Sequence, residues 1–418
     1  MSFQQGISGL SANSKYLDVI GNNIANSSTV GAKSSRVEFA DVYSSAQSSG
    51  ANKQTGGGVS VAAVSQNFGQ GGITSTGNPL DLAISGKGFF QMKGQDGTVH
   101  YTRDGQFKLN SNGEIVNNQD HLLMGYPADA AGAVLSGQAQ AVQLKATSIE
   151  PKATTAVIVN ANLDSRSVAI HPAGGPAVVF TDPSTYNNAT AVNAVDANGK
   201  DVVLTSYFQK TSADTWDVYM TANGAAIGGT PTVPVTTITF DPTGSAPLSP
   251  TTPVTVNVPA GPVVNGVGTL PITGLLIDMS TFTQFASPYG VTKLAQDGYS
   301  AGALIGMVVD SSGLVRANYS NGRTKSIGQI EMATFTNLNG LQPLGGGEWA
   351  STINSGGPAL GVPGSGNLGT LQTSALEESN VDLTGELVNM MIAQRNYQAN
   401  AQTIKTQDQV LQTLVNLR

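Results

Sequence analysis

The sequence contains no cysteine, which excludes disulfide bonds, thiolate metal sites and cysteine nucleophiles. Charged residues make up 11% of the chain, against roughly 25% in an ordinary globular protein, and aromatic residues only 6%. The formal net charge of −7 excludes the basic surface that a nucleic-acid partner requires. Glycine is abundant instead, at 50 of 418 residues. This composition favours β-rich domains with many tight turns over a compact metabolic enzyme.

Long hydrophobic runs are also missing. No stretch approaches the ~18 apolar residues of a transmembrane helix, so we expect no membrane insertion. The N-terminal residues lack the basic start and uninterrupted apolar run of a Sec signal peptide. If the protein leaves the cytoplasm, we therefore expect it to be exported without a cleaved signal peptide.

Motifs that carry chemistry are absent as well. The histidines, His100, His121 and His171, do not have the spacing of a His-Glu-x-x-His zinc motif, and the chain has no nucleophile elbow or Walker loop. The run Gly364–Gly369 matches G-x-G-x-x-G, but Pro363 and more glycines precede it, where a dinucleotide site needs a strand. We predict no enzymatic activity and no catalytic, cofactor-binding or metal-ligating residues.

Both ends of the chain carry apolar residues at alternating four- and three-residue spacing, the a/d seam of a coiled coil. Ser379 and Asp382 loosely fit a capping box at the start of the C-terminal helix. We predict that helices over 1–28 and 371–418 pair as a coiled coil. The N-terminal seam consists of Phe3, Ile7, Leu10, Leu17 and Ile24. The C-terminal seam consists of Leu383, Leu387, Met390, Tyr397, Ala401, Ile404, Leu411 and Val415.

Between the helices the pattern is one of short strands and turns. We predict an extended connector over 29–71, because this segment is rich in Ser, Gly, Ala and Gln. An outer β domain follows over 72–145 and resumes, with a second connector, over 286–370. The Val-, Thr- and Pro-rich stretch 146–285 is predicted to be an inserted β-sandwich or barrel. The expected fold is mainly β and multidomain, with paired terminal helices.

The two seams alone do not bury enough apolar surface to stabilise the helix pair. Each buried Leu-sized side chain contributes roughly 1.5–3 kcal/mol, so both seams together yield on the order of 20–30 kcal/mol. Ordering about 65 residues costs about 1–2 kcal/mol each in backbone entropy alone. A helix pair that packs only through its own two seams is therefore marginally stable. We expect other copies of the chain to cover the remaining apolar surface.

Several segments resemble the family of bacterial flagellar rod and hook subunits. The segment at 21–33 reads GNNIANSSTVGAK and is similar to the N-terminal signature of that family, although Ala32 stands where an aromatic residue is usual. Residues 78–91 and 101–117 resemble the shared outer β domain, and residues 379–418 the C-terminal helix. The signature residues that we assign by this resemblance are Gly21, Asn22, Asn23, Ile24, Ala25 and Asn26.

Two further segments favour the hook members of the family over the rod members. Residues 189–220 resemble an inserted domain that rod proteins lack, and residues 289–341 resemble the return of hook subunits into their outer domain. The resemblance implies a non-enzymatic structural subunit that self-assembles into a curved, flexible tube. Such a tube acts as a universal joint, transmits motor torque from rod to filament and encloses the export channel.

The resemblance also implies partners and a location. The expected partners are other copies of the chain, the distal rod protein, the hook cap protein, the hook–filament junction proteins and the flagellar type III export apparatus. The expected location is extracellular, in the flagellum. The nearest alternative is a distal rod subunit of the basal body. A more distant alternative is a secreted β-rich adhesin, which the terminal motifs disfavour.

Overall fold

The computed structural model describes residues 2–42, 58–129, 131–135, 137–144, 148–170, 178–227, 233–261 and 268–416. The chain divides into two compact units. The first unit comprises Met1–Ala146, Gly306–Asn318 and Thr324–Arg418, and the second comprises Thr147–Ile305 and Tyr319–Arg323. The predicted inserted domain, 146–285, coincides with most of the second unit, which continues further along the chain to Ile305.

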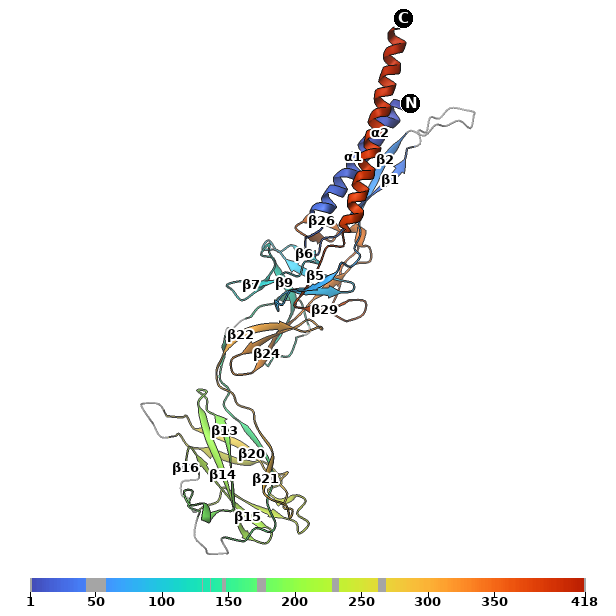
Figure 1. The fold of residues 1–418 in the computed structure, drawn as a ribbon. Helices are drawn as coiled ribbons and strands as arrows, with labels where there is room; N and C mark the ends of the chain where they lie inside the picture. The colour runs from blue at the N-terminus through green and yellow to red at the C-terminus, as the bar shows by residue number, and fades with distance from the viewer. Residues whose placement is uncertain are drawn as a thin grey trace. The chain divides into compact units, whose positions relative to one another are not determined.

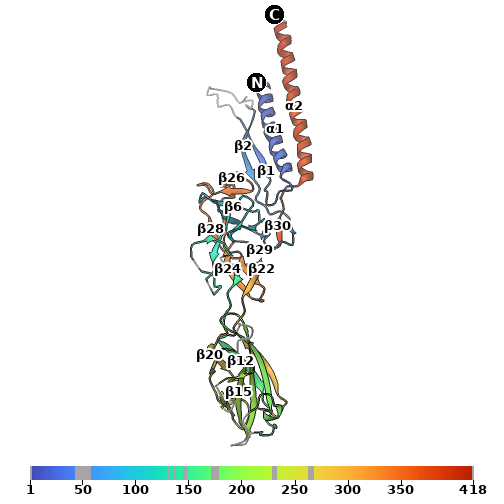
Figure 2. The same ribbon diagram turned by 90° about the vertical axis from the view of Figure 1, so that its left-hand side faces the viewer.

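Helices α1, Ser2–Ala25, and α2, Leu383–Asn416, belong to the first unit and lie side by side (Figures 1 and 2). The predicted pairing of the terminal helices is thus confirmed. Helix α2 starts directly after Asp382, whose side chain accepts a hydrogen bond from the Thr384 N–H at 3.1 Å. Ser379 lies before the helix, so the capping-box interpretation was wrong. The predicted helical segment 371–418 starts with strands instead.

The described strands of the first unit form one large sheet and three small pairs. The chain enters this unit's β domain, leaves it after β10, and returns to it through β22. Its strands are β1 Ser35–Asp41, β2 Val59–Gln66, β3 Ile73–Ser75, β4 Leu82–Ser85, β5 Phe89–Lys93, β6 Val99–Thr102, β7 Lys108–Leu109, β8 Ile115–Val116, β9 Leu122–Pro127, β10 Gln140–Ala141, β22 Gly302–Val309, β23 Leu314–Tyr319, β24 Thr324–Ile330, β25 Met332–Thr334, β26 Gln342–Gly345, β27 Glu348–Ala350, β28 Ala359–Gly361, β29 Thr370–Thr373 and β30 Ala375–Glu377.

The large sheet interleaves the two passages of the chain. Its central order is β24-β9-β5-β6-β27-β26, so that β9, β5 and β6 from the first passage lie between β24 and β27 from the second. An aromatic cluster packs here, in which Phe89 meets Trp349 and Phe335 edge to face with ring centroids 5.7 and 6.1 Å apart. The prediction that a β domain is split by an insertion is therefore confirmed for the fold.

The segment 29–71 differs from the extended connector that the composition predicts. Strands β1 and β2 pair antiparallel from Ser35↔Gln66 to Asp41↔Val59, with an irregularity between Glu38 and Phe39. The hairpin packs against α1, where Tyr16 and Phe39 meet edge to face with centroids 6.0 Å apart. Residues 43–57 of this segment lie outside the described residues. Local composition did not reveal the hairpin, because its strands pack against a separate element, α1.

The glycine-rich stretch 345–370, at the end of the segment 286–370 in which a second connector was expected, contributes short strands to the sheet. Strand β27 pairs with β6, and β28 pairs with β25. A short 3-10 turn, Leu338–Gly340, precedes β26. The stretch is therefore held by main-chain hydrogen bonds along much of its length.

The second unit is a β-sandwich, as predicted for the inserted domain. Its two main sheets have the orders β19-β20-β12-β21 and β13-β14-β15-β17-β18, and side chains from both form one core around Trp216, Phe208 and Phe282. Along β12 buried and half-buried residues alternate, the period-2 pattern of a strand with one face in a core. The strands are β11 Ser148–Ile149, β12 Ala156–Asn162, β13 Asn188–Val195, β14 Asp201–Ser212, β15 Thr215–Ala222, β16 Ala225–Ala226, β17 Thr236–Phe240, β18 Pro247–Ser249, β19 Val254–Val258, β20 Ile272–Asp278 and β21 Gly290–Gln296, with a 3-10 turn at Pro183–Thr185.

Within the described ranges, neither helix is long and apolar enough to cross a membrane.

Candidate assembly surface

Helices α1 and α2 approach each other through small residues. Gly6 faces Ile404, and a β-carbon at Gly6 would lie 2.9 Å from Ile404 Cγ1. Gly9 faces Asn400, where a β-carbon would lie 3.0 Å from Oδ1. Glycine costs an exposed helix roughly 0.5–1 kcal/mol relative to alanine, but here it permits contact that a side chain would block. Ala393, on the facing helix, is fully buried.

The signature residue Asn23 ties three elements together at the other end of the pair. Its side-chain N–H groups donate to the Ser35 carbonyl at 2.7 Å and to Glu386 Oε1 at 3.0 Å, and its Oδ1 accepts from the Ser35 N–H at 2.9 Å. Asn26, four residues after Asn22, donates its backbone and side-chain N–H groups to the Asn22 carbonyl. These contacts give Asn23 and Asn26 a structural role at the end of α1.

The predicted seams only partly coincide with this interface. The buried α1 positions are Gly6, Gly9, Ala12, Ile20 and Asn23. Gly6, Gly9 and Asn23 each directly precede a residue of the predicted seam, whereas Ala12 and Ile20 do not. Half-buried seam residues are Leu10, Leu17, Ile24, Met390, Ala401 and Ile404. Exposed ones are Phe3, Ile7, Leu383, Leu387, Tyr397, Leu411 and Val415.

Helix α2 also carries exposed apolar residues outside the predicted seam. Met391 is 54% exposed and Ile392 is 49% exposed. Polar residues at these two positions would not reduce the stability of the single folded chain. Large apolar surface of this kind, left in water by a folded chain, indicates an interaction site. We call the following residues the exposed apolar set: Phe3, Ile7, Leu383, Leu387, Val388, Met391, Ile392, Tyr397, Val410, Leu411 and Val415.

Part of this set is exposed because α2 is longer than α1. The helices have 24 and 34 residues, or about 36 and 51 Å at 1.5 Å per residue. The helices run antiparallel. Gly9 faces Asn400, and Gly6, three residues earlier on α1, faces Ile404, four residues later on α2. At this rate Ser2 lies opposite about residue 408. Leu411 and Val415 therefore lie beyond the described part of α1. Both views show the C-terminal end of α2 extending past α1 (Figures 1 and 2).

A buried ion-pair cluster fixes the base of the helix pair to the β domain. Glu377 is fully buried; its Oε1 accepts from Lys33 Nζ at 2.6 Å and its Oε2 accepts from Arg103 Nη1 at 3.0 Å. The Gly71 N–H also donates to Glu377 Oε1, at 3.0 Å. Burial lowers the pKa of the Lys33 ammonium and of the Arg103 guanidinium, and Glu377 only partly offsets this. The carboxylate thus holds two desolvated cations from different parts of the chain.

Sequence reasoning missed both Glu377 and the glycine contacts. The ion-pair cluster joins residues spread over more than 340 positions, Lys33, Arg103 and Glu377. In the sequence alone, each resembles an ordinary charged surface residue. The spacing of Gly6 and Gly9 was visible in the sequence, but a search for large apolar residues passes over it. His171, the third histidine considered above, lies outside the described residues.

Models of flagellar protein families match most of the chain. Residues 3–33 match the flagella basal body rod protein model, and residues 83–174 the flagellar hook protein FlgE/F/G D1 domain. Residues 162–299 match the flagellar basal body protein FlaE D2 domain, and residues 372–417 the flagellar basal body rod FlgEFG protein C-terminal model. The paired terminal helices and split β domain therefore belong to a subunit of the flagellar rod and hook class.

Relatives along the whole length narrow this class. The chain is 41% identical over 420 residues to the flagellar hook protein FlgE of Salmonella typhimurium, and 40% identical over 422 residues to that of Escherichia coli, covering 100% of each chain. It is 32% identical over 450 residues to FlgE of Borreliella burgdorferi, with 100% of this chain and 99% of the relative covered. The chain belongs to the flagellar hook protein family.

A solved structure agrees at the level of the fold. The crystal structure of the Helicobacter pylori flagellar hook protein FlgE2 matches with a TM-score of 0.50 and 14% sequence identity. The match covers 73% of this chain and 100% of that one. At this identity the likeness concerns the arrangement of the strands alone.

Proposed function

We propose that the chain is the structural subunit of a bacterial flagellar hook and self-assembles into a curved, flexible tube. The tube joins rod to filament, transmits motor torque while bending, and encloses the export channel. The observation that carries this proposal is the exposed apolar set, which the folded chain leaves in water. Burying the exposed half of these eleven side chains would supply roughly 10 kcal/mol or more per subunit.

In this proposal the helix pairs of neighbouring copies pack together as the inner wall of the tube. The overhanging end of α2, with Leu411 and Val415, lies against α1 or α2 of another copy, where a further apolar partner is available. The β1–β2 hairpin contributes a second contact, because Phe39 and Val64 remain partly exposed on it although it packs against α1. Membership of the hook family supports this arrangement.

Bending then takes place between subunits rather than at the base of the helix pair. The Lys33–Glu377–Arg103 cluster and the strands of 345–370 oppose a hinge there. Contacts between the β domains of neighbouring copies must slide as the tube bends, which weak, hydrated polar contacts permit. The low charge and abundant Ser, Thr, Asn and Gln of the sequence suit such contacts.

Other partners and the location follow from the same proposal. The subunit passes through the flagellar type III export apparatus and is added to the extracellular flagellum beneath the hook cap protein. The distal rod protein binds one end of the finished tube, and the hook–filament junction proteins bind the other. No catalytic step is assigned to the chain.

Electron microscopy of the purified full-length chain, concentrated in assembly-promoting salt, tests this function. We expect tubes that curve and that vary in curvature with solution conditions. Straight, rigid tubes under all conditions would instead indicate the distal rod subunit. A chain that stays monomeric at concentrations where a purified hook protein such as the Salmonella relative polymerises would contradict self-assembly altogether.

A further inference from the structure

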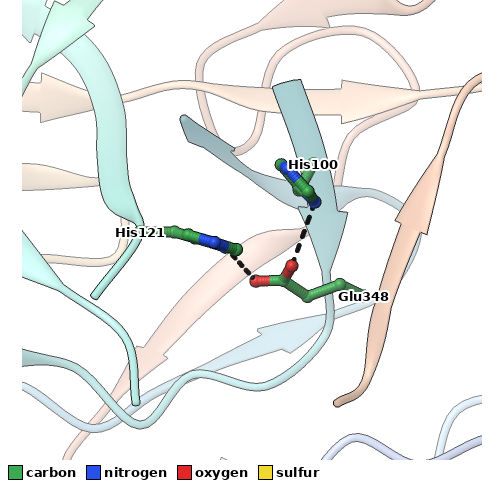
Figure 3. Close-up of side chains that lie close together, drawn as sticks. All are labelled: His100, His121 and Glu348. Carbon is green, nitrogen blue, oxygen red and sulfur yellow. Dashed lines mark hydrogen bonds and ion pairs between the residues drawn. The ribbon is translucent and has the colours of Figure 1, made fainter. Parts of the chain in front are cut away.

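Two histidines and a glutamate that are far apart in the sequence meet in the first unit (Figure 3). His100 lies on β6, His121 directly precedes β9, and Glu348 begins β27. Nδ1 of His100 is 3.1 Å from Glu348 Oε2, and Nδ1 of His121 is 2.8 Å from Glu348 Oε1. The three potential ligand atoms all lie within 4.8 Å of one another. The histidine spacing in the sequence gave no sign of this cluster, because the topology of the sheet creates it.

Hydrogen bonds determine which nitrogen of His100 carries a proton. Thr98 Oγ1 gives its single hydrogen to Asp96 Oδ1 at 2.6 Å, so it can only accept from His100 Nε2–H, also at 2.6 Å. The hydrogen bonds from Thr98 lower the pKa of Asp96, which keeps that carboxylate ionised and an acceptor. In the neutral ring, the lone pair therefore resides on Nδ1 and is directed at the cluster.

This Nδ1 has no hydrogen-bond partner although it is buried and a carboxylate oxygen lies 3.1 Å away. Two acceptors that face each other repel unless a positive charge lies between them. Either a proton on Nδ1, which pairs the imidazolium with Glu348, or a metal ion that bonds to both atoms supplies that charge. The nitrogen without a hydrogen bond is therefore an observation, separate from the residue types, that a bound metal ion would account for.

The distances suit a small divalent ion. Zinc binds imidazole nitrogen at about 2.0–2.1 Å and carboxylate oxygen at about 2.0–2.2 Å, which separates tetrahedral ligands by roughly 3.4 Å. The observed 2.8 and 3.1 Å are shorter than this by about 0.6 and 0.3 Å, so the side chains must move apart slightly to admit the ion. His100 and His121 are 16% and 21% exposed, so water can reach a fourth position.

Outer contacts hold the ligands in place, as they do in established metal sites. Asn117 Nδ2 donates to Glu348 Oε1 at 2.7 Å, and Asn117 Oδ1 accepts from the backbone N–H of His121 at 2.9 Å. Thr98 orients His100 in the same way. Two imidazoles with one carboxylate form a donor set that favours zinc and its first-row neighbours over magnesium or calcium.

We propose that His100, His121 and Glu348 bind one Zn²⁺ ion, or a divalent first-row ion of the same class. The ion cross-links β6 and the start of β9, from the first passage of the chain, to β27 from the second. Its role is to stabilise the first unit.

Equilibrium dialysis of the full-length monomer against Zn²⁺, with elemental analysis of the protein, tests the site. We expect one Zn²⁺ per chain and a melting temperature that rises with Zn²⁺ and falls back with a chelator. His121→Gln should weaken binding by more than about 100-fold and remove the thermal shift. Thr98→Val removes only an orienting contact and should weaken binding by about 10-fold. Co²⁺ in place of Zn²⁺ should give the visible absorption of a tetrahedral site.

Two control variants keep the outcome decisive. His171→Gln removes the third histidine and should leave binding unchanged. His121→Cys keeps a zinc ligand at this position and should retain binding, which separates loss of the ligand from misfolding. Absence of stoichiometric Zn²⁺ in the wild type would overturn the proposal. So would binding that survives His121→Gln or is lost in His171→Gln.

Discussion

Leu411→Asp is expected to abolish polymerisation while leaving both β units folded. Leu411 is 48% exposed on the single chain, so the monomer loses little, within about 0.5 kcal/mol, as for other surface substitutions. In the proposed tube the side chain is buried against a neighbouring copy. An unpaired carboxylate there costs several kcal/mol, and each 1.4 kcal/mol is tenfold in association. The concentration needed for polymerisation should rise by at least about 100-fold, as measured by sedimentation and electron microscopy.

Gln409→Asp is the matched control for this substitution. It places the same charge two residues earlier, on the opposite side of α2, because successive residues turn by about 100°. We expect it to polymerise at close to the wild-type concentration. If Leu411→Asp polymerises as well as Gln409→Asp, the overhanging end of α2 is not part of the assembly contact.

Glu377→Gln is expected to lower the free energy of unfolding of the first unit by about 3–5 kcal/mol. The change leaves Lys33 and Arg103 buried without their shared counter-charge. Because burial already lowers the pKa of Lys33, the loss should shrink as pH rises towards the ordinary lysine value of 10.5. At that pH the Lys33 amine can lose its proton, so the folded variant holds one uncompensated buried charge instead of two.

Denaturant unfolding of the monomer at pH 7 and pH 10 measures this effect. Glu38→Gln is the control, since Glu38 forms an ion pair with Arg36 at 3.0 Å that is exposed to solvent. It should change stability little at either pH. Equal losses in the two variants would show that the Glu377 cluster does not hold the base of the helix pair.

The architecture could be predicted because it follows from local patterns. Alternating residues such as those of β12 mark strands, and the heptads at both ends mark helices, whatever they pack against. The β1–β2 hairpin could not be predicted in the same way. Its strands are stabilised by α1, and the Ser-, Gly-, Ala- and Gln-rich composition of the whole segment masks the short alternations at Val37 and Phe39 and at Val59 and Val61.

Part of the candidate assembly surface could likewise be predicted from local spacing. Leu411 and Val415 fall on the heptad, so spacing alone placed them in the predicted seam, and their role in assembly stays a prediction. The helix contact itself uses Gly6 and Gly9, whose importance lies in the side chain that they lack. Glu377 and the His100–His121–Glu348 cluster depend on partners more than 200 positions away, and only the fold brings these partners together.

Thiol labelling tests the central claim, that polymerisation buries the exposed apolar set. The chain has no cysteine, so Met391→Cys introduces a single thiol on α2 at a site 54% exposed in the monomer. Val168→Cys, at a site 77% exposed in the second unit, serves as the reference. We predict that Met391→Cys reacts readily in the monomer and about tenfold or more slowly in the polymer, while Val168→Cys changes much less. Equal reactivity of Met391→Cys in monomer and polymer would contradict the account.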